Sequence, residues 1–123
     1  MRLTREEIRR MLQISVCEDA VAAFNALGYR SRASVLTGSD DLKRMVLMVI
    51  DRGVALGLQA GGEGEGKIEL RRGHVCCSCS FGDSGLLLHP APGETLRFGA
   101  NYYGQMQLHQ WLEGWEGQCS SSL

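Results

Sequence analysis

The sequence lacks an apolar run long enough to cross a membrane. Its longest apolar stretch covers residues 42–50 and is broken by Lys43 and Arg44, whereas a transmembrane helix needs about 20 apolar residues. The first ten residues include two glutamates and no apolar segment, so we expect no signal peptide. We therefore expect a cytoplasmic protein that makes no membrane contact.

A disulfide framework is also missing. The chain has five cysteines, an odd number, and three of them crowd together as Cys76, Cys77 and Cys79. Secreted domains that depend on disulfides usually carry an even number of spaced cysteines. This pattern again favours a reduced, cytoplasmic protein.

A surplus of charge of either sign is absent. Lys and Arg total 13, Asp and Glu total 14, and the net charge is −1, so no overall field attracts nucleic acid or anionic lipid. Residues 21–35 look like a bacterial helix-turn-helix. However, Phe24 stands where that family has a small residue, and Ser34 where it has an apolar one. We therefore expect no nucleic-acid partner.

The patterns of common catalytic sites are missing as well. Residues 82–85, Gly-Asp-Ser-Gly, are similar to the motif around the nucleophile of trypsin-like serine proteases. Leu86 follows where that family continues with Gly-Pro, and the family's histidine motif is absent. Residues 61–66 contain four glycines but no Lys or Ser/Thr of a phosphate-binding loop. We interpret both segments as turns, assign no catalytic residue and expect no cofactor.

What the chain does have is the composition of a globular protein. It contains 123 residues, of which 44% are apolar and 22% charged, and this length fits one domain. We predict a single α+β domain over residues 1–123, with 117–123 as a disordered tail.

Two helix-start signals lie near the N-terminus. Thr4 and Glu7 form a capping box, and Ser15 with Glu18 forms a second. Gly28 is the residue expected just past the end of the second helix. The loose alternation of residues 29–36 then predicts an edge strand.

The most apolar segment predicts a central helix that ends at Gly53. Its apolar residues repeat at helical spacing, at Leu42, Met45, Val46, Val49 and Ile50. The alternative is a β-hairpin made of residues 45–50 and 54–59, because a short apolar run fits either element. We favour the helix.

The second half of the chain reads as strands separated by turns. The alternation in residues 67–72 predicts that Ile68 and Leu70 face inward and that Lys67, Glu69 and Arg71 face outward. Further strands are predicted at 75–81, 86–89 and 95–98, and residues 54–60 are either a strand or a continuation of the helix. Residues 61–66 are predicted to form a flexible loop.

A last helix is predicted over residues 102–113, because Asn101 is a good N-cap and Gly114 a good terminator. Its large apolar residues form one stripe, at Leu108, Trp111, Leu112 and Trp115. The fold prediction is therefore α+β, with an antiparallel β-meander of four or five strands. N-terminal, central and C-terminal helices pack with this meander.

The cysteine cluster has two interpretations. Thiolates and imidazoles bind zinc and soft metals, which makes Cys76, Cys77, Cys79 and His74 candidates for a thiol or metal site. On a strand, however, Cys77 and Cys79 share one face and Cys76 the other, and no second Cys-x-x-Cys completes a metal site. We favour buried core cysteines and assign no metal.

The helices carry more apolar surface than one sheet needs to cover, which favours a homodimer. The leading functional hypothesis is a non-catalytic module that binds a protein partner. The alternative is a small-molecule binder with an apolar, aromatic-lined pocket. In either case the expected contact residues are Met45, Met48, Tyr103, Trp111 and Trp115.

Overall fold

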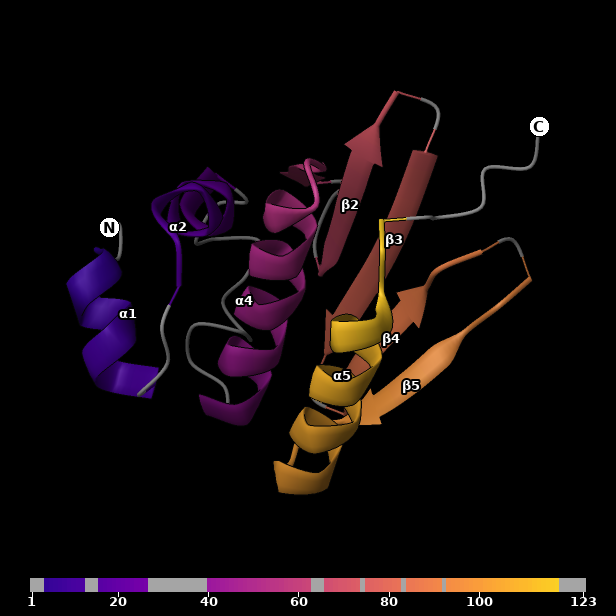
Figure 1. Ribbon diagram of the computed structural model, residues 1–123. Helices are drawn as coiled ribbons and strands as arrows, with labels where there is room; N and C mark the ends of the chain where they lie inside the picture. Colours follow the sequence, from indigo (N-terminus) through magenta and orange to yellow (C-terminus); the bar gives the residue numbers. More distant parts are fainter. Residues whose placement is uncertain are drawn as a thin grey trace.

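The computed structural model describes residues 4–12, 16–26, 40–62, 66–73, 75–82, 84–91 and 93–117. These residues form four helices and a five-stranded antiparallel sheet (Figure 1), which confirms the α+β prediction. The helices are α1 (Arg5–Leu12), α2 (Glu18–Ala26), α4 (Asp40–Ala55) and α5 (Tyr102–Gly114). The strands are β1 (Gln59–Gly62), β2 (Lys67–Arg72), β3 (Val75–Gly82), β4 (Gly85–His89) and β5 (Leu96–Gly99).

The strand order β1-β2-β3-β4-β5 is that of a simple meander. Because each strand reverses the chain and the number of strands is odd, β5 runs in the same direction as β1. The helix before β1 and the helix after β5 therefore run parallel to each other. Both lie on one face of the sheet, with α4 between α5 and the N-terminal helices α1 and α2 (Figure 1).

The N-terminal helices begin at capped residues. In α1 the Thr4 hydroxyl accepts from the Glu7 backbone N–H and the Glu7 carboxylate accepts from the Thr4 N–H, both at 3.2 Å, which confirms the first capping box. Helix α2 begins after Cys17, whose Sγ accepts from the Ala20 N–H at 3.4 Å. Ser15, Gly28 and residues 29–36 lie outside the described residues.

The central segment is a helix, so the β-hairpin interpretation is wrong. Gly53 does not end this helix, which continues to Ala55. Gly53 is instead a contact residue, because a Cβ there would lie 3.0 Å from the Leu70 side chain. After Ala55 the chain turns at Gly57, whose positive φ of 84° permits two closing bonds, from Gly57 N to Val54 O and from Leu58 N to Gly53 O.

Helix α4 contributes most to the core, because it contacts α1, α2, α5 and the sheet. Burial of each large apolar side chain contributes about 1.5–3 kcal/mol. Six of its apolar residues are buried, namely Leu42, Met45, Val46, Leu47, Val49 and Ile50. Burial on more than one side of the helix therefore explains why residues 45–50 are all apolar.

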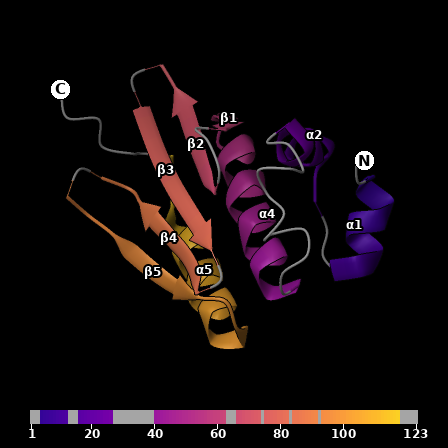
Figure 2. The same cartoon turned by 180° about the vertical axis from the view of Figure 1, so that it is seen from behind.

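The inner face of the sheet packs against the helices, and the outer face is turned away from them (Figure 2). The predicted alternation holds for Ile68 and Leu70, which are buried, and for Lys67 and Arg71, which are exposed. The prediction that Glu69 is exposed is wrong. This residue shares the outer face with Arg71, but it is only 9% exposed. The Arg71 guanidinium forms an ion pair with its carboxylate, and this partner accounts for the burial of a charge.

The predicted glycine loop at 61–66 is partly wrong. Gly61 and Gly62 belong to β1 and pair with Glu69 and Ile68. Residues 63–65 lie outside the described residues. A glycine-rich sequence therefore forms an edge strand here because the neighbouring strand β2 supplies its hydrogen-bonding partners.

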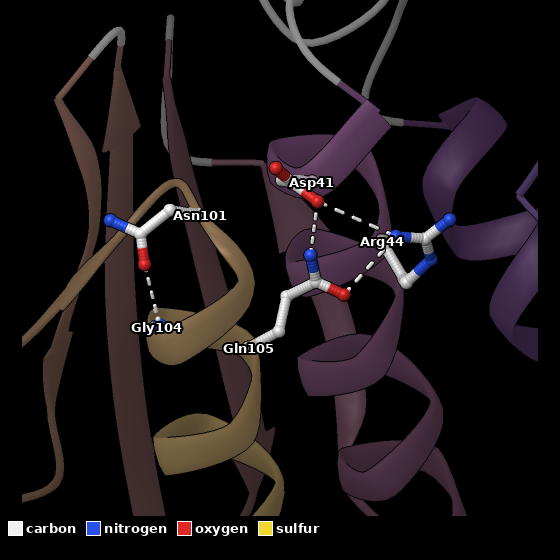
Figure 3. Close-up of polar contacts among 5 residues, drawn as sticks. All are labelled: Asp41, Arg44, Asn101, Gly104 and Gln105. Carbon is white, nitrogen blue, oxygen red and sulfur yellow. Dashed lines mark hydrogen bonds and ion pairs between the residues drawn. The ribbon is translucent and has the colours of Figure 1, made fainter.

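Helix α5 begins where the sequence predicts. The Asn101 side-chain oxygen accepts from the Gly104 N–H at 2.8 Å (Figure 3). Gly104 must be a glycine because a Cβ there would lie 1.7 Å from the Gly99 carbonyl oxygen. This close approach fixes the first turn of α5 on the end of β5. Residues 118–123 of the predicted tail lie outside the described residues.

Candidate functional site

The two parallel helices α4 and α5 leave a groove between them. A pocket of about 440 Å³ is lined by Val16, Met48, Asp51, Arg52, Ala55, His109, Leu112 and Glu113. A second pocket, of about 470 Å³, is lined by Met48, Tyr102, Gln105, Met106, His109, Gln110 and Glu113. Because the two pockets share three residues, Met48, His109 and Glu113, they form one continuous surface, which we call the α4–α5 groove.

A polar cluster joins the N-terminal ends of the two helices (Figure 3). Arg44 Nη1 donates to Gln105 Oε1 at 3.1 Å and lies 3.5 Å from Asp41 Oδ1. The Gln105 amide also donates to Asp41. Since the cluster is only partly exposed, these bonds are less screened than surface ion pairs and hold the helices in register.

A second clamp joins the C-terminal ends. Arg52 Nε donates to the Leu112 carbonyl at 3.0 Å, and Arg52 Nη2 donates to the Trp115 carbonyl at 2.8 Å. The last carbonyls of a helix have no partners within it and carry partial negative charge, so a guanidinium suits them. The groove therefore has a polar clamp at each end and the half-buried Met48 between them.

Charges of both signs line the rim of the groove. His109 Nε2 lies 2.6 Å from Glu113 Oε1, but both side chains are exposed, so this pair adds little to stability. Asp51 Oδ1 accepts from the Cys17 backbone N–H at 3.0 Å and so links α4 to the start of α2. The lining is thus an apolar floor with polar groups near its edges, which is the usual make-up of a binding site.

Within and beside the groove, α5 exposes three large apolar side chains. Tyr102 is 67% exposed, Tyr103 75% and Met106 46%. The two tyrosine rings contact each other edge to face, with centroids 6.0 Å apart. We call Tyr102, Tyr103 and Met106 the α5 face. Single exposed apolar residues are ordinary, but this cluster adjoins an apolar groove.

The predicted contact residues are distributed over four places. Met45 is 0% exposed and belongs to the core, whereas Met48 lies in the groove and Tyr103 on the α5 face. Trp111 and Trp115 contact each other with ring centroids 5.4 Å apart. They line a separate pocket of about 410 Å³ at the C-terminal end of α5.

Sequence reasoning missed most of the groove. Its lining residues lie about 60 positions apart in the sequence, and several are polar. On α4, Asp41, Arg44, Met48 and Arg52 repeat at helical spacing, but this stripe is mostly charged and reads as a solvent-exposed face. The parallel arrangement of α4 and α5 was the missing information, because it aligns Asp41 with Gln105 and Arg52 with Leu112.

The described cysteines are consistent with structural roles. Cys77 and Cys79 are buried and point to the core side of the sheet, while Cys17 caps α2. Desolvation and the nearby Asp51 side chain raise the pKa of the Cys17 thiol, so it stays protonated at neutral pH and is a weak nucleophile. The side chains of His74 and Cys76 lie outside the described residues.

Among the described residues, no group of three or more His, Cys, Asp or Glu side chains is arranged to hold a metal ion. Within the same part of the chain, no helix has the length and apolar character needed to cross a bilayer. Comparisons with protein family models, curated protein sequences and solved structures found no match.

Proposed function

We propose that the protein is a non-catalytic binding module that docks a protein partner on the α4–α5 groove and the α5 face. The observation that carries this proposal is the exposure of Tyr102, Tyr103 and Met106 beside an apolar groove. Apolar clusters of this kind on a soluble protein often mark a contact surface.

The composition of this surface suits protein recognition. Tyrosine supplies a large contact area with few rotatable bonds, so ordering it on binding costs little entropy. Methionine adapts to irregular partner surfaces. The two polar clamps keep α4 and α5 in place, and a partner therefore meets a surface that is already formed.

A second copy of the chain is the first partner to consider. Most soluble homo-oligomers are symmetric dimers, in which the same patch of each copy meets itself. The odd number of cysteines supports a reducing, cytoplasmic setting for such a complex. In this proposal the Met106 side chains lie near the centre of the contact.

The test compares Met106→Glu with Gln107→Glu. Both residues are exposed on α5 and both changes add one negative charge, but only Met106 lines the groove. Sedimentation equilibrium from micromolar to submillimolar protein is expected to show a dimer whose dissociation constant rises at least about tenfold in Met106→Glu. Gln107→Glu is expected to match the wild type.

The same two variants extend the test to other proteins. Crosslinking in cell extract is expected to yield partners that wild type and Gln107→Glu share and that Met106→Glu loses. A wild-type chain that stays monomeric, together with identical crosslinked partners for all three proteins, would contradict the proposal.

A small apolar ligand in the groove is the second candidate. The pocket volume of about 440 Å³ falls within the range typical of small-molecule sites, roughly 300–1,000 Å³. Ala55→Trp would fill that pocket, and Ala55 does not line the second pocket, to which Tyr102 and Met106 of the α5 face belong. A compound that raises the melting temperature of the wild type and of Met106→Glu, but not of Ala55→Trp, would favour this candidate over protein docking.

A further inference from the structure

The outer face of the sheet lies on the side away from the helices (Figure 2). The strand register places several polar residues on this face. Lys67 on β2 lies directly opposite Ser80 on β3, and Ser78 on β3 lies directly opposite His89 on β4. Residues two apart on a strand share a face, so Ser78 and Ser80 lie side by side. The register thus brings an ammonium, two hydroxyls and an imidazole onto three adjacent strands.

These four residues line a cavity of about 160 Å³, together with Ile68 and Cys79. The side chains of Ile68 and Cys79 are buried in the core, so these two residues offer the cavity their backbone. The volume is well below the roughly 300 Å³ at which pockets for whole small molecules begin. The cavity therefore has room for one polar group of a ligand.

The charge around this cavity favours an anion. Among the described residues of this row, Glu69, opposite Ser78, is the acidic one, and its carboxylate is paired with Arg71. The neighbouring row runs from Lys67 through Ser80 and Leu87 to the exposed Arg97. Cations therefore lie at both ends of that row.

The geometry points to a site for a phosphoryl or sulfate group, bound by Lys67, Ser78, Ser80 and His89. The Lys67 ammonium supplies a charge-assisted hydrogen bond, and the two serine hydroxyls donate to further oxygens. The His89 ring is held by a hydrogen bond between Nδ1 and Thr95 Oγ1 at 3.2 Å, and Nε2 is the second nitrogen able to bond the ligand. This site is independent of the α4–α5 groove and would remain if the proposed partner docking failed.

Titration with sodium sulfate at constant ionic strength, with sodium chloride as the balancing salt, tests the site. Sulfate is expected to shift backbone amide resonances of residues 78–80 and 89 in a saturable way and to raise the melting temperature. Lys67→Gln is expected to weaken sulfate binding roughly tenfold or more, and Ser80→Ala about threefold to tenfold. Arg10→Gln, which removes an exposed cation from α1, is the matched control and is expected to bind as the wild type does.

Inorganic phosphate and O-phosphoserine distinguish the two sources of the group. Tighter binding of O-phosphoserine would assign the site to a phosphorylated molecule, and tighter binding of inorganic phosphate to the free ion. The inference would be overturned by resonance shifts that do not saturate. It would equally be overturned if Lys67→Gln and Arg10→Gln changed the affinity by the same factor.

Discussion

Helices α4 and α5 lie side by side on the same face of the sheet, yet they differ in what they expose. Helix α4 buries six large apolar side chains and presents only a narrow stripe to the groove. Helix α5 buries Leu108 and Leu112 and exposes Tyr102, Tyr103 and Met106. The first helix therefore serves mainly the core, and the second divides its residues between the core and an outward surface.

This difference separates stability from function within one layer of the fold. Substitutions in the buried residues of α4 should unfold the protein before they reveal anything about binding. Substitutions on the outer side of α5 should leave the fold intact and change only contacts with a partner. The same type of substitution can therefore be placed on each helix and compared directly.

The largest effect is expected from a matched pair of methionine truncations. Met45→Ala on α4 removes a fully buried side chain and is expected to lower the free energy of unfolding by about 2–5 kcal/mol. Met106→Ala on α5 removes a side chain that is 46% exposed and is expected to change it by less than about 0.5 kcal/mol. Urea denaturation measures both values. Equal losses in the two variants would remove the distinction between the helices.

Replacing two glycines of α5 by alanine is expected to change the stability of the protein in opposite directions. Gly104→Ala forces a Cβ against the Gly99 carbonyl and is expected to destabilise the protein by about 2–3 kcal/mol. Gly114→Ala has open space around its Cβ and is expected to stabilise by up to about 0.5–1 kcal/mol, because alanine favours helix. Thermal unfolding of the two variants checks the signs. Stabilisation by both would show that α5 does not begin on the end of β5.

Removing the Arg52 clamp at the C-terminal end of α5 is expected to lower the free energy of unfolding by a slightly smaller amount. Arg52→Met keeps the apolar stem of the side chain but removes both donors, so the Trp115 carbonyl loses its Arg52 bond and the Leu112 carbonyl keeps only the Trp115 N–H. The expected loss is about 1–3 kcal/mol. Arg52→Lys keeps one of the two bonds and is expected to lose about half as much. Hydrogen exchange should show the last turn of α5 opening first, and protection unchanged there would contradict the role of Arg52.

Helices α4 and α5 also show which features of the structure can be predicted from the sequence alone. Both helices and four of the strands were predictable because burial imposes a period of 3.6 or 2 on the apolar residues. Helical spacing places Met45 on the apolar stripe of α4 and Met48 off it, but it does not show what Met48 contacts. Only the position of α5 shows that Met48 lines a groove.

Two other predictions were wrong because a contact with a residue in another element outweighed the local sequence pattern. Glycine normally ends a helix, but Gly53 lies within α4 because Leu70 packs directly on it. Alternation predicted an exposed Glu69, but the ion pair with Arg71 allows its burial. In both cases the deciding partner lies in another element, which the local sequence does not reveal.

The smallest expected effect is on the pKa of Cys17. Asp51, on the side of α4 that lines the groove, contributes to this pKa. Desolvation and the Asp51 side chain raise the pKa of Cys17 above its ordinary value of 9.0. Alkylation of Cys17 by iodoacetamide, followed by mass spectrometry of the peptide that contains it, is expected to accelerate with a midpoint above pH 9.0. Asp51→Asn keeps the acceptor for the Cys17 N–H but removes the charge, so the midpoint is expected to move down.

The raised pKa of Cys17 also makes the free energy of unfolding depend on pH. The folded state favours the neutral thiol more than the unfolded state does. Its contribution is therefore complete below about pH 9.0 and is lost as the pH rises through the higher pKa of the folded protein. Cys17→Ser, which keeps an N-cap and does not titrate in this range, should lose less stability than the wild type over that interval. If the wild type and Cys17→Ser lost stability in parallel above pH 9.0, the groove side of α4 would have no influence on Cys17. The alkylation midpoint of Asp51→Asn should then equal that of the wild type.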